Sequence, residues 1–411
     1  MAELRTPKLG GVVTYIPNDS NLIFLAGSKI KSFRPFVPFD SILIEFLIDI
    51  SSELIKRPES RTYPDIMAFA FWCRKANINK LKKRFEDGLF RLGLGLVFHI
   101  TPSNVPVNFA FSFAFGLLSG NANIVRAPTK SFPQVDVICE VIKSILLLEK
   151  YDQINSMNAI VKYSQKDKIT KYFSANSNAR LIWGGDETIR NIRNFSTPER
   201  CVDIAFSDRY SFCVIETEAV LELDERELQL LAEHFYNDTY LMDQNACSSP
   251  HLVVWLGKLG ERGKKRFWPA VYQVVRKKYG LPFVNAVDKF TSLCQNAIDL
   301  DQIKSISTHG NLLCRILMDT LPDNMDTLRG KFGCFYEFEA TDINQVSHIV
   351  NKRYQTLTYF GVKKSYLTDF VVQNRLFGID NITPIGSALD IGIFWDGYDI
   401  VRCLSRTINV K

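Results

Sequence analysis

The feature that most constrains the fold is a regular alternation of short apolar segments with amphipathic ones. Buried strands are expected at residues 94–100, 122–126, 157–161 and 180–183. Helices are expected at 105–118 and 132–149, between the first three strands, and another begins near Asp186. Strands that alternate with helices form a parallel sheet with crossover connections. The sequence therefore predicts an α/β nucleotide-binding architecture of the Rossmann type.

The alternation continues in the second half of the chain. Strands are expected at residues 212–215, 252–256, 335–338 and 356–362, and helices at 264–279 and 343–353. Asp224 and Glu227 form a D-x-x-E capping box before a further helix. Since 411 residues exceed one ordinary core, we expect two domains. The predicted boundaries are 1–211 for a cofactor-binding domain with a helical N-terminal lead-in, 212–374 for a catalytic α/β domain, and 375–411 for a segment that returns to the first domain.

Composition excludes several classes of protein. With 46% hydrophobic and 23% charged residues, the chain is not disordered. Its net charge of +6 is spread without a basic tail, so no nucleic-acid partner is expected. Nine Cys without C-x-x-C pairs predict neither a disulfide framework nor a zinc site. The first eleven residues lack an apolar segment typical of secretory signals, which favours a reducing, cytoplasmic location.

One uncharged run, Ile100 to Val125, is long enough to be compared with a membrane span. Pro102, Pro106 and several Asn and Gly residues interrupt it. We therefore expect a buried helix between two strands and no span.

Cys247 stands in a polar loop, DQNACSSP, between a helix and a buried strand. Loops that a rigid sheet positions are common sites of reactive groups. The other eight Cys have apolar or helical neighbours and are expected to be packed thiols. The residues alone leave Cys247 as either a nucleophile or an ordinary loop thiol.

Two further segments place polar groups at expected strand ends, where α/β folds bind ligands. In HITPSNVPV, Asn104 either donates to a developing oxyanion or caps the next helix, and His99 fits a hydrogen-bonded core histidine. In LIWGGDETIRNIR, Gly184 and Gly185 either admit a diphosphate at a helix start or simply make a tight turn. Arg126 either meets a ribose or 2′-phosphate, or is a solvated surface residue.

Several common motifs are absent from the chain. G-x-G-x-x-G does not occur in the required context, so the usual dinucleotide pattern is missing. The motifs of P-loop ATPases, zincins and α/β-hydrolases are also missing, which excludes those classes.

Six motifs in order resemble the LuxC-type acyl-CoA reductases, the reductase subunits of bioluminescence fatty-acid reductase and a branch of the aldehyde dehydrogenase superfamily. They are HITPSNVP, LLSGNANIVR, WGGDETIRNIR, FSDRYSFCVI, MDQNACSSP and WDGYDIVRCLSR. The resemblance covers roughly residue 93 to the C-terminus. It implies an aldehyde-dehydrogenase-like fold, with a Rossmann-type cofactor domain and an α/β catalytic domain.

The resemblance also implies residue roles. Cys247 would be the nucleophile, and Asn104 would form an oxyanion hole with the N–H of Cys247. The candidate cofactor-binding residues are Thr101, Pro102, Arg126, Thr129, Trp183, Gly184, Gly185 and Phe332. Among them Arg126 would touch the adenosine ribose, Thr129 would reach a 2′-substituent, the glycines would lie beside the diphosphate, and Phe332 would lie near the nicotinamide.

Two positions depart from the superfamily pattern. Phe206 stands where hydrolytic aldehyde dehydrogenases have a water-activating Glu, which disfavours release of free acid. Asp208 is the nearest replacement but matches no superfamily base. Gly330 stands where a second Glu is usual, two residues before Phe332, so the resemblance implies no carboxylate contact to the nicotinamide ribose from this position.

The function that the resemblance implies is reduction of an acyl-CoA to the aldehyde through a thioester on Cys247. A fatty acyl-CoA is the first candidate for the substrate. No acidic residue stands among Arg126, Thr129 and Lys130, which favours NADP(H), with NAD(H) as the alternative. We expect no metal. The expected partners are an acyl-transferring synthetase subunit and further copies of the chain in a homo-oligomer. The alternatives are a reductase of an acyl-phosphate or acyl-protein, and a non-catalytic subunit that holds an acyl chain.

Overall fold

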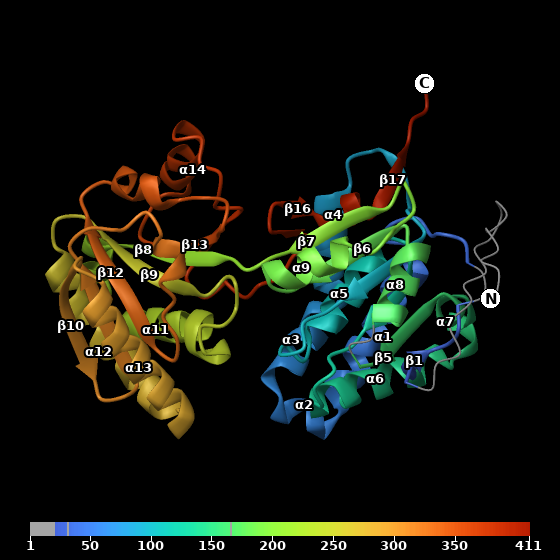
Figure 1. Cartoon of the computed structure of the whole chain (residues 1–411), viewed down its shortest axis with the longest axis horizontal. Coiled ribbons are helices and arrows are strands. Elements are labelled where there is room, and N and C mark those ends of the chain that lie inside the picture. Colours follow the sequence, from blue (N-terminus) through green and yellow to red (C-terminus); the bar gives the residue numbers. More distant parts are fainter. Residues whose placement is uncertain (1–20, 31–32, 165–166) are drawn as a thin grey trace. The chain divides into compact units, whose positions relative to one another are not determined.

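The computed structural model describes residues 21–30, 33–164 and 167–411 (Figure 1). The chain forms two compact units. The first comprises residues 1–207 and 392–411, and the second comprises residues 208–391. The predicted α/β fold is confirmed, because each unit is built on its own mainly parallel sheet.

The first sheet has the order β1-β5-β4-β3-β6-β7. Its strands are β1 (Ile23–Gly27), β3 (Leu96–Ile100), β4 (Ala122–Arg126), β5 (Asn158–Lys162), β6 (Ala179–Trp183) and β7 (Val202–Phe206). All pairs are parallel except β1 with β5. The order runs outward from β3 in both directions, so the topological switch point lies between β3 and β6. In open α/β sheets, ligands bind outside the carboxyl ends of the strands at such a point.

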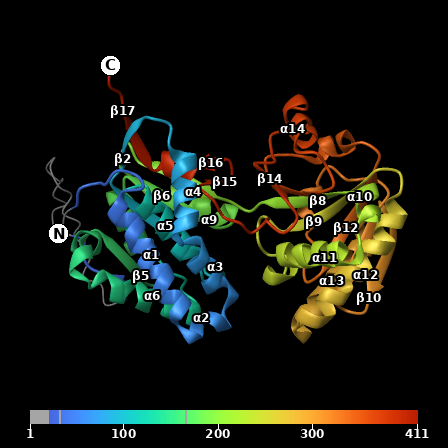
Figure 2. The ribbon, with the colours of Figure 1, turned by 180° about the vertical axis from the view of Figure 1, so that it is seen from behind.

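Helices cover both faces of this sheet. On one face α8 (Asp167–Asn176) and α9 (Asp186–Arg193) share a core with the strands. On the other, α5 (Asn108–Leu118) packs on β4 and α6 (Pro133–Leu146) on β1, while α1 (Ser41–Lys56) packs outside α6. Figure 2 shows α1 and α6 side by side. Nine of the eleven residues of α5 are buried, as expected for a helix between sheet and helix layers. Over the described residues, no helix is long and apolar enough to cross a membrane.

The remaining elements of the first unit complete its surface. They are α2 (Pro58–Thr62), α3 (Pro64–Trp72), α4 (Lys75–Phe85), β2 (Phe90–Gly93), η1 (Glu149–Tyr151), α7 (Asp152–Ser156), β15 (Phe394–Trp395), β16 (Tyr398–Asp399), α15 (Ile400–Cys403) and β17 (Ser405–Ile408). The expected helical lead-in contains α1 to α4 but also β1, which joins the first sheet, and its residues 1–20 and 31–32 lie outside the described residues. Asp40 caps α1 by accepting from the Ile42 N–H at 3.1 Å. β17 pairs with β2, so the end of the chain returns to the first unit.

The second sheet has the order β10-β11-β12-β9-β8-β13-β14. Its strands are β8 (Tyr210–Glu216), β9 (Pro250–Leu256), β10 (Ile303–His309), β11 (Leu313–Met318), β12 (Cys334–Ala340), β13 (Tyr354–Phe360) and β14 (Asn381–Pro384). Only β10 with β11 is antiparallel. One face packs against α11 (Glu225–Thr239) and α12 (Gly260–Lys278). The other packs against η4 (Ile343–Ile349), α14 (Lys364–Gln373) and the inner side of α13 (Phe283–Asp299).

The short helices of this unit are α10 (Thr217–Glu222), η2 (Tyr240–Met242) and η3 (Met325–Thr327). The predicted capping box is confirmed: Asp224 accepts from the Glu227 N–H at 2.8 Å, and Glu227 accepts from the Asp224 N–H at 2.9 Å. The helix expected at 343–353 is instead the short 3-10 helix η4, which ends at Ile349.

The C-terminal return begins later in the chain than the sequence indicated. β14 pairs in parallel with β13, and this pairing keeps residues 375–391 with the second sheet. The return to the first unit begins at Gly392. The first unit ends at Ser207, before β8, whereas the expected boundary followed residue 211.

Candidate active site

Four strand ends form a continuous row at the carboxyl edge of the first sheet. In the register, Ile100 of β3 pairs with Arg126 of β4 and with Ile182 of β6, and Trp183 pairs with Phe206 of β7. The loops that leave these strands begin side by side. The Thr101 hydroxyl donates to the Arg126 carbonyl at 2.6 Å and joins two of them. The structure thus brings Thr101, Pro102, Arg126 and the Trp183–Gly185 turn to one edge.

Arg126 is held by an aromatic ring. Its guanidinium lies over the ring of Tyr163, 4.7 Å from the centroid, and the residue is half-buried. A cation stacked in this way is not the solvated surface arginine of the alternative interpretation. Thr129 is half-buried in the loop that follows, and Lys130 is exposed above the ring of Phe132. The group suits the recognition of a ribose or its phosphate.

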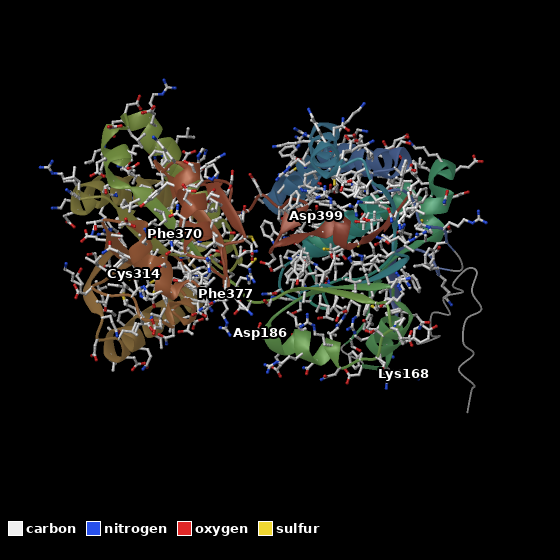
Figure 3. All side chains as sticks on the ribbon, turned by 90° about the horizontal axis from the view of Figure 1, so that it is seen from above. Lys168, Asp186, Cys314, Phe370, Phe377 and Asp399 are labelled. Carbon is white, nitrogen blue, oxygen red and sulfur yellow. The ribbon has the colours of Figure 1, made fainter. Side chains whose placement is uncertain are left out.

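The Gly184–Gly185 turn is open enough for a phosphate to approach its backbone. Gly185 is the N-cap of α9 and is exposed, and a Cβ added there would meet no atom within 4 Å. Gly185 has no side chain that could cap the first N–H groups of α9. Figure 3 labels Asp186 at this helix start. Asp186 and Glu187 lie in the first turn and oppose part of its positive potential.

Trp183 and Phe206 form a stacked pair at the same edge. Their ring centroids are 3.7 Å apart with planes at 17°, and both residues are buried. The Trp183 indole N–H donates to the Ser112 hydroxyl of α5 at 3.0 Å. No carboxylate therefore stands at position 206, and its place is filled by an aromatic ring packed on an indole.

Asn104 lies in an exposed loop between β3 and α5. The helix begins at Asn108, and its N-cap, Val107, makes no side-chain capping bond. The alternative that Asn104 caps this helix is therefore wrong. The expectation for His99 is confirmed: it is fully buried, with Nδ1 2.8 Å from Ser112 Oγ and Nε2 3.0 Å from Asn123 Oδ1.

Burial of His99 makes the fold sensitive to acid. Burial lowers the pKa of this imidazole from 6.5 to about 4. The unfolded chain thus binds a proton that the folded chain rejects, so stability is complete above pH 6.5 and is lost as the pH falls toward 4. We predict that His99→Gln removes this dependence. The slope of the free energy of unfolding against pH should fall by up to about 1.4 kcal/mol per pH unit between pH 6.5 and pH 4. Urea unfolding from pH 7 to 4.5 measures it. Parallel curves for variant and wild type would contradict the assignment.

Cys247 lies in the loop 243–249, which leads from η2 into β9. The residue is half-buried, and its carbonyl accepts from the Ser211 hydroxyl at 2.7 Å. Ser211 is fully buried on β8 and also accepts from the Thr356 N–H of β13 at 3.1 Å. On the far side of the loop, the Ser249 hydroxyl donates to the Asp238 carbonyl of α11 at 2.7 Å. The loop of the candidate nucleophile is therefore bonded directly to β8 and α11, and β13 in turn fixes Ser211.

Gln244 joins the cysteine loop to the turn that carries Phe332. Its amide nitrogen donates to the carbonyls of Pro250 and Cys334 at 3.3 and 3.1 Å, and its oxygen accepts from the Gly333 N–H at 2.9 Å. Because β9 and β12 are neighbours, Cys247 and Phe332 lie at adjacent amino ends of one sheet. The structure thus places these two predicted residues together in the second unit.

The turn at Phe332 has an unusual backbone. Phe332 has φ +55°, and its carbonyl accepts from the buried Lys289 ammonium at 2.8 Å. A Cβ added at Gly330 would lie 1.8 Å from the Cys334 carbonyl oxygen. No side chain fits at that position, so the missing Glu reflects a backbone packed too closely to hold one.

The other cysteines mostly match the expectation of packed thiols. Five are buried, and two, Cys201 and Cys403, are half-buried. Burial raises the pKa of the Cys73 and Cys213 thiols. Cys294 is the exception, because it lies on the exposed side of α13. Among the described residues no group of three or more His, Cys, Asp or Glu gathers where it could hold a metal ion.

Sequence reasoning missed Gln244, Ser211 and Lys289. Gln244 stands inside the DQNACSSP motif, so its position next to the cysteine was visible. Its partners lie up to 90 residues away, and Ser211 bonds Cys247, 36 residues away, and Thr356 of β13, 145 residues away. No local pattern marks such pairs.

The contacts of Gln244 predict a structural role that can be measured. Gln244→Ala would leave one buried N–H and two buried carbonyls without this partner, and each such group costs about 1–3 kcal/mol. We expect the free energy of unfolding to fall by at least about 2 kcal/mol. Chemical denaturation of the variant and of Asn245→Ala, an exposed neighbouring amide, provides the comparison. Equal stability of the two variants would contradict the prediction.

Comparison with known proteins connects these residues to a family. The model of the acyl-CoA reductase (LuxC) family matches residues 76–271, which include Asn104, Arg126, Trp183 and Cys247. Phe332 lies beyond the matched residues. A search of curated proteins by sequence finds no significant match.

Solved structures of similar fold are aldehyde dehydrogenases. Aldehyde dehydrogenase 21 from Physcomitrella patens, in complex with its reaction product succinate, matches with a TM-score of 0.65 and 12% identity over 89% of this chain and 85% of that chain. A Thermus thermophilus 1-pyrroline-5-carboxylate dehydrogenase variant gives 0.63 and 12% over 95% and 90%. A Bradyrhizobium japonicum proline utilization A variant gives 0.62 and 13% over 89% and 42%. At these identities the likeness shows the fold alone, and it confirms the expected aldehyde-dehydrogenase-like architecture.

Proposed function

We propose that this chain reduces a fatty acyl-CoA to the aldehyde with NADPH through a thioester on Cys247. Residues 76–271 match the model of the LuxC-type acyl-CoA reductases, so the chain is an oxidoreductase that acts on acyl or aldehyde groups. The observation that carries the proposal is the cysteine loop, which lies within the matched residues and is fixed by Ser211 and Gln244. The direct test is incubation with acyl-CoAs of increasing chain length and NADPH or NADH. Loss of cofactor absorbance with release of CoA thiol is expected.

In the first step the Cys247 thiolate attacks the carbonyl carbon of the acyl-CoA thioester. The bond from that carbon to the CoA sulfur then breaks, and CoA leaves as a thiolate. The acyl group remains as a thioester on Cys247. In this proposal the Asn104 side-chain amide and the Cys247 N–H donate to the oxyanion, each contributing about 2.7–4 kcal/mol as in comparable sites.

In the second step the thioester is reduced. A nicotinamide held by the residues named below would supply the hydride, which carries two electrons to the acyl carbon. The carbon–sulfur bond to Cys247 then breaks, which releases the aldehyde and restores the thiolate. The same two donors receive the oxyanion again, so the protein supplies position and polarity in both steps.

All of the cofactor residues proposed for this chain except Phe332, which belongs to the second unit, lie at the carboxyl edge of the first sheet. Thr101, Pro102, Arg126, Thr129 and the Trp183–Gly185 turn would hold the dinucleotide, and Phe332 would contact the nicotinamide. A preference for NADPH is supported by the guanidinium of Arg126, held over Tyr163, because a planar cation suits a phosphate better than a hydroxyl. Equal kcat/KM with NADH would remove this part of the proposal.

Further parts of the proposal concern partners and location. An acyl-transferring synthetase subunit would deliver the acyl group, and the chain would form a homo-oligomer in the cytoplasm, where nine unbridged thiols persist. A donor other than CoA, an acyl-phosphate or acyl-protein, is the second candidate for the substrate. Stoichiometric acyl binding without cofactor turnover would instead indicate a subunit that only holds an acyl chain.

We predict that Cys247→Ala abolishes aldehyde formation while the fold is kept, because no other thiol lies in this loop. Labelled acyl-CoA should leave on the wild type a thioester that survives denaturation and is cleaved by hydroxylamine. Cys294→Ala, which removes an exposed thiol on α13, is the matched control and should keep both activity and label. A label that maps to any other cysteine would show the assignment to be wrong.

Asn104→Ala should slow turnover about 10²–10³-fold with little change in cofactor affinity, because it removes one oxyanion donor. Asn108→Ala changes an amide at the start of α5 that has no proposed role in catalysis and serves as the control. Steady-state kinetics with a saturating acyl-CoA separates kcat from KM. A change in KM alone would exclude an oxyanion role for Asn104.

Slow hydrolysis of the acyl-enzyme is expected from position 206. Phe206 replaces the water-activating carboxylate, and such general-base help is worth about 10²–10⁴-fold. The nearby Asp208 is engaged in an ion pair with Arg329 at 3.0 Å, which makes it a poor substitute. With aldehyde and NADP⁺ the enzyme should form acyl-CoA when CoA is present and nearly stop without it. Sustained release of free acid without CoA would identify a dehydrogenase instead.

A further inference from the structure

A chain of buried polar side chains crosses the first sheet beneath α5. It runs from Trp183 on β6 through Ser112 on α5, His99 on β3 and Asn123 on β4 to Asn158 on β5. The four links measure 3.0, 2.8, 3.0 and 2.7 Å in that order. Every member is at least nine-tenths buried. No step of the proposed mechanism uses His99, Asn123 or Asn158.

The groups at the two ends of this hydrogen-bond chain fix the direction in which its protons are donated. At one end the Asn158 amide nitrogen donates to the Ile154 carbonyl at 2.7 Å, so the Asn158 oxygen faces Asn123. The Asn123 nitrogen donates to that oxygen and to the Asn121 carbonyl, so its own oxygen must accept from His99. The His99 proton is therefore on Nε2, and Nδ1 accepts from the Ser112 hydroxyl. The Ser112 oxygen in turn accepts from the indole N–H of Trp183, which can only donate.

The space around His99 is shaped for this arrangement. A Cβ added at Gly116 of α5 would lie 2.0 Å from the Asn123 side-chain oxygen and 2.8 Å from His99 Nε2. Glycine inside a helix costs about 1 kcal/mol relative to alanine, so the close approach of His99 and Asn123 is made at the expense of helix stability. The groups that contact the imidazole, Ser112, Asn123 and Gly116, carry no charge.

The hydrogen-bond chain connects two regions that the proposed reaction needs, the Asn104 loop and the Trp183–Gly185 turn. His99 precedes the Asn104 loop by one strand residue, and Ser112 follows it in α5, so their hydrogen bond spans the loop from both sides. Trp183 begins the Gly184–Gly185 turn. Ser112 bonds both His99 and Trp183 and therefore joins the loop of Asn104 to the turn proposed for the diphosphate.

We propose that His99, with its proton on Nε2, is a positioning residue that couples the Asn104 loop to the Trp183–Gly185 turn through Ser112. The inference rests on the proposed function and deepens it, because it makes acylation of Cys247 and binding of NADPH depend on one hydrogen-bond chain. A purely structural core histidine would affect stability and leave the two processes unlinked.

The tautomer is tested without any activity measurement. Nitrogen-15 NMR of the histidine-labelled protein, with His99 assigned from the spectrum of His99→Gln, reports which ring nitrogen carries the proton. We expect the Nε2–H form at pH 7. A proton on Nδ1 would reverse the direction of the chain and overturn the inference.

The coupling is tested at Ser112. Ser112→Ala removes the group that joins both regions, and Ser119→Ala is the matched control, since Ser119 is equally buried at the end of the same helix and donates to the Phe115 carbonyl. Two quantities are measured: the rate of CoA release from acyl-CoA without NADPH, and the Kd of NADPH without acyl-CoA. We expect acylation to slow about 10-fold or more and NADPH to bind several-fold more weakly in Ser112→Ala alone.

The conservative variant Ser112→Thr keeps a hydroxyl and should recover most of both effects. If Ser112→Ala does not fold, His99→Phe replaces it, because a phenylalanine ring has about the size of the imidazole but neither the donor to Asn123 nor the acceptor for Ser112. Values in the Ser112 variant equal to those of Ser119→Ala, or a change in only one of the two quantities, overturn the coupling. If the wild type releases no CoA from any acyl-CoA, the proposed function fails. The tautomer of His99 and the Kd of NADPH then still test whether the hydrogen-bond chain is formed and whether it affects the Trp183–Gly185 turn.

Discussion

The central strand of the first sheet, β3, is buried along its whole length, and this constraint shapes the rest of the unit. Helices cover it on both faces, so a polar side chain within it must find its partners inside the protein. His99 does so through Ser112 and Asn123, on a helix and a neighbouring strand. Because β3 lies beside the topological switch point, the loop that leaves it carries Thr101 and Asn104 to the edge where nucleotides bind in such sheets.

Local patterns in the sequence predicted what local physics controls. The strand Ala122–Arg126 has the predicted bounds, and both hydrogen bonds of the capping box at Asp224 are present. The helix expected from Val105 starts three residues later, at Asn108, because Pro106 lies in the preceding turn and the loop between β3 and α5 is irregular. The segment 343–353 has helical spacing, but it forms a seven-residue 3-10 helix, η4, which is longer than most 3-10 helices.

Contacts between distant parts of the chain were out of reach of such patterns. The motif around Cys247 identified a candidate nucleophile, whereas its supports come from Ser211 and from the turn at Gly333. Lys289 is the only buried residue of α13, whereas the outer side of this helix exposes apolar residues. The apolar spacing of α13 therefore does not mark its buried face. The buried ammonium is stabilised by the carbonyls of Asn311 and Phe332, which only the folded chain brings together.

The stacking of Phe206 on Trp183 has a consequence for how such enzymes evolve. A carboxylate introduced at position 206 would be buried against an indole, away from water, and would remove the ring on which Trp183 packs. Replacing Phe206 by a carboxylate while Trp183 is kept would therefore destabilise the protein. On the reaction proposed for this chain, a lineage that passed from thioester reduction to hydrolysis would have to rebuild residue 183 together with residue 206.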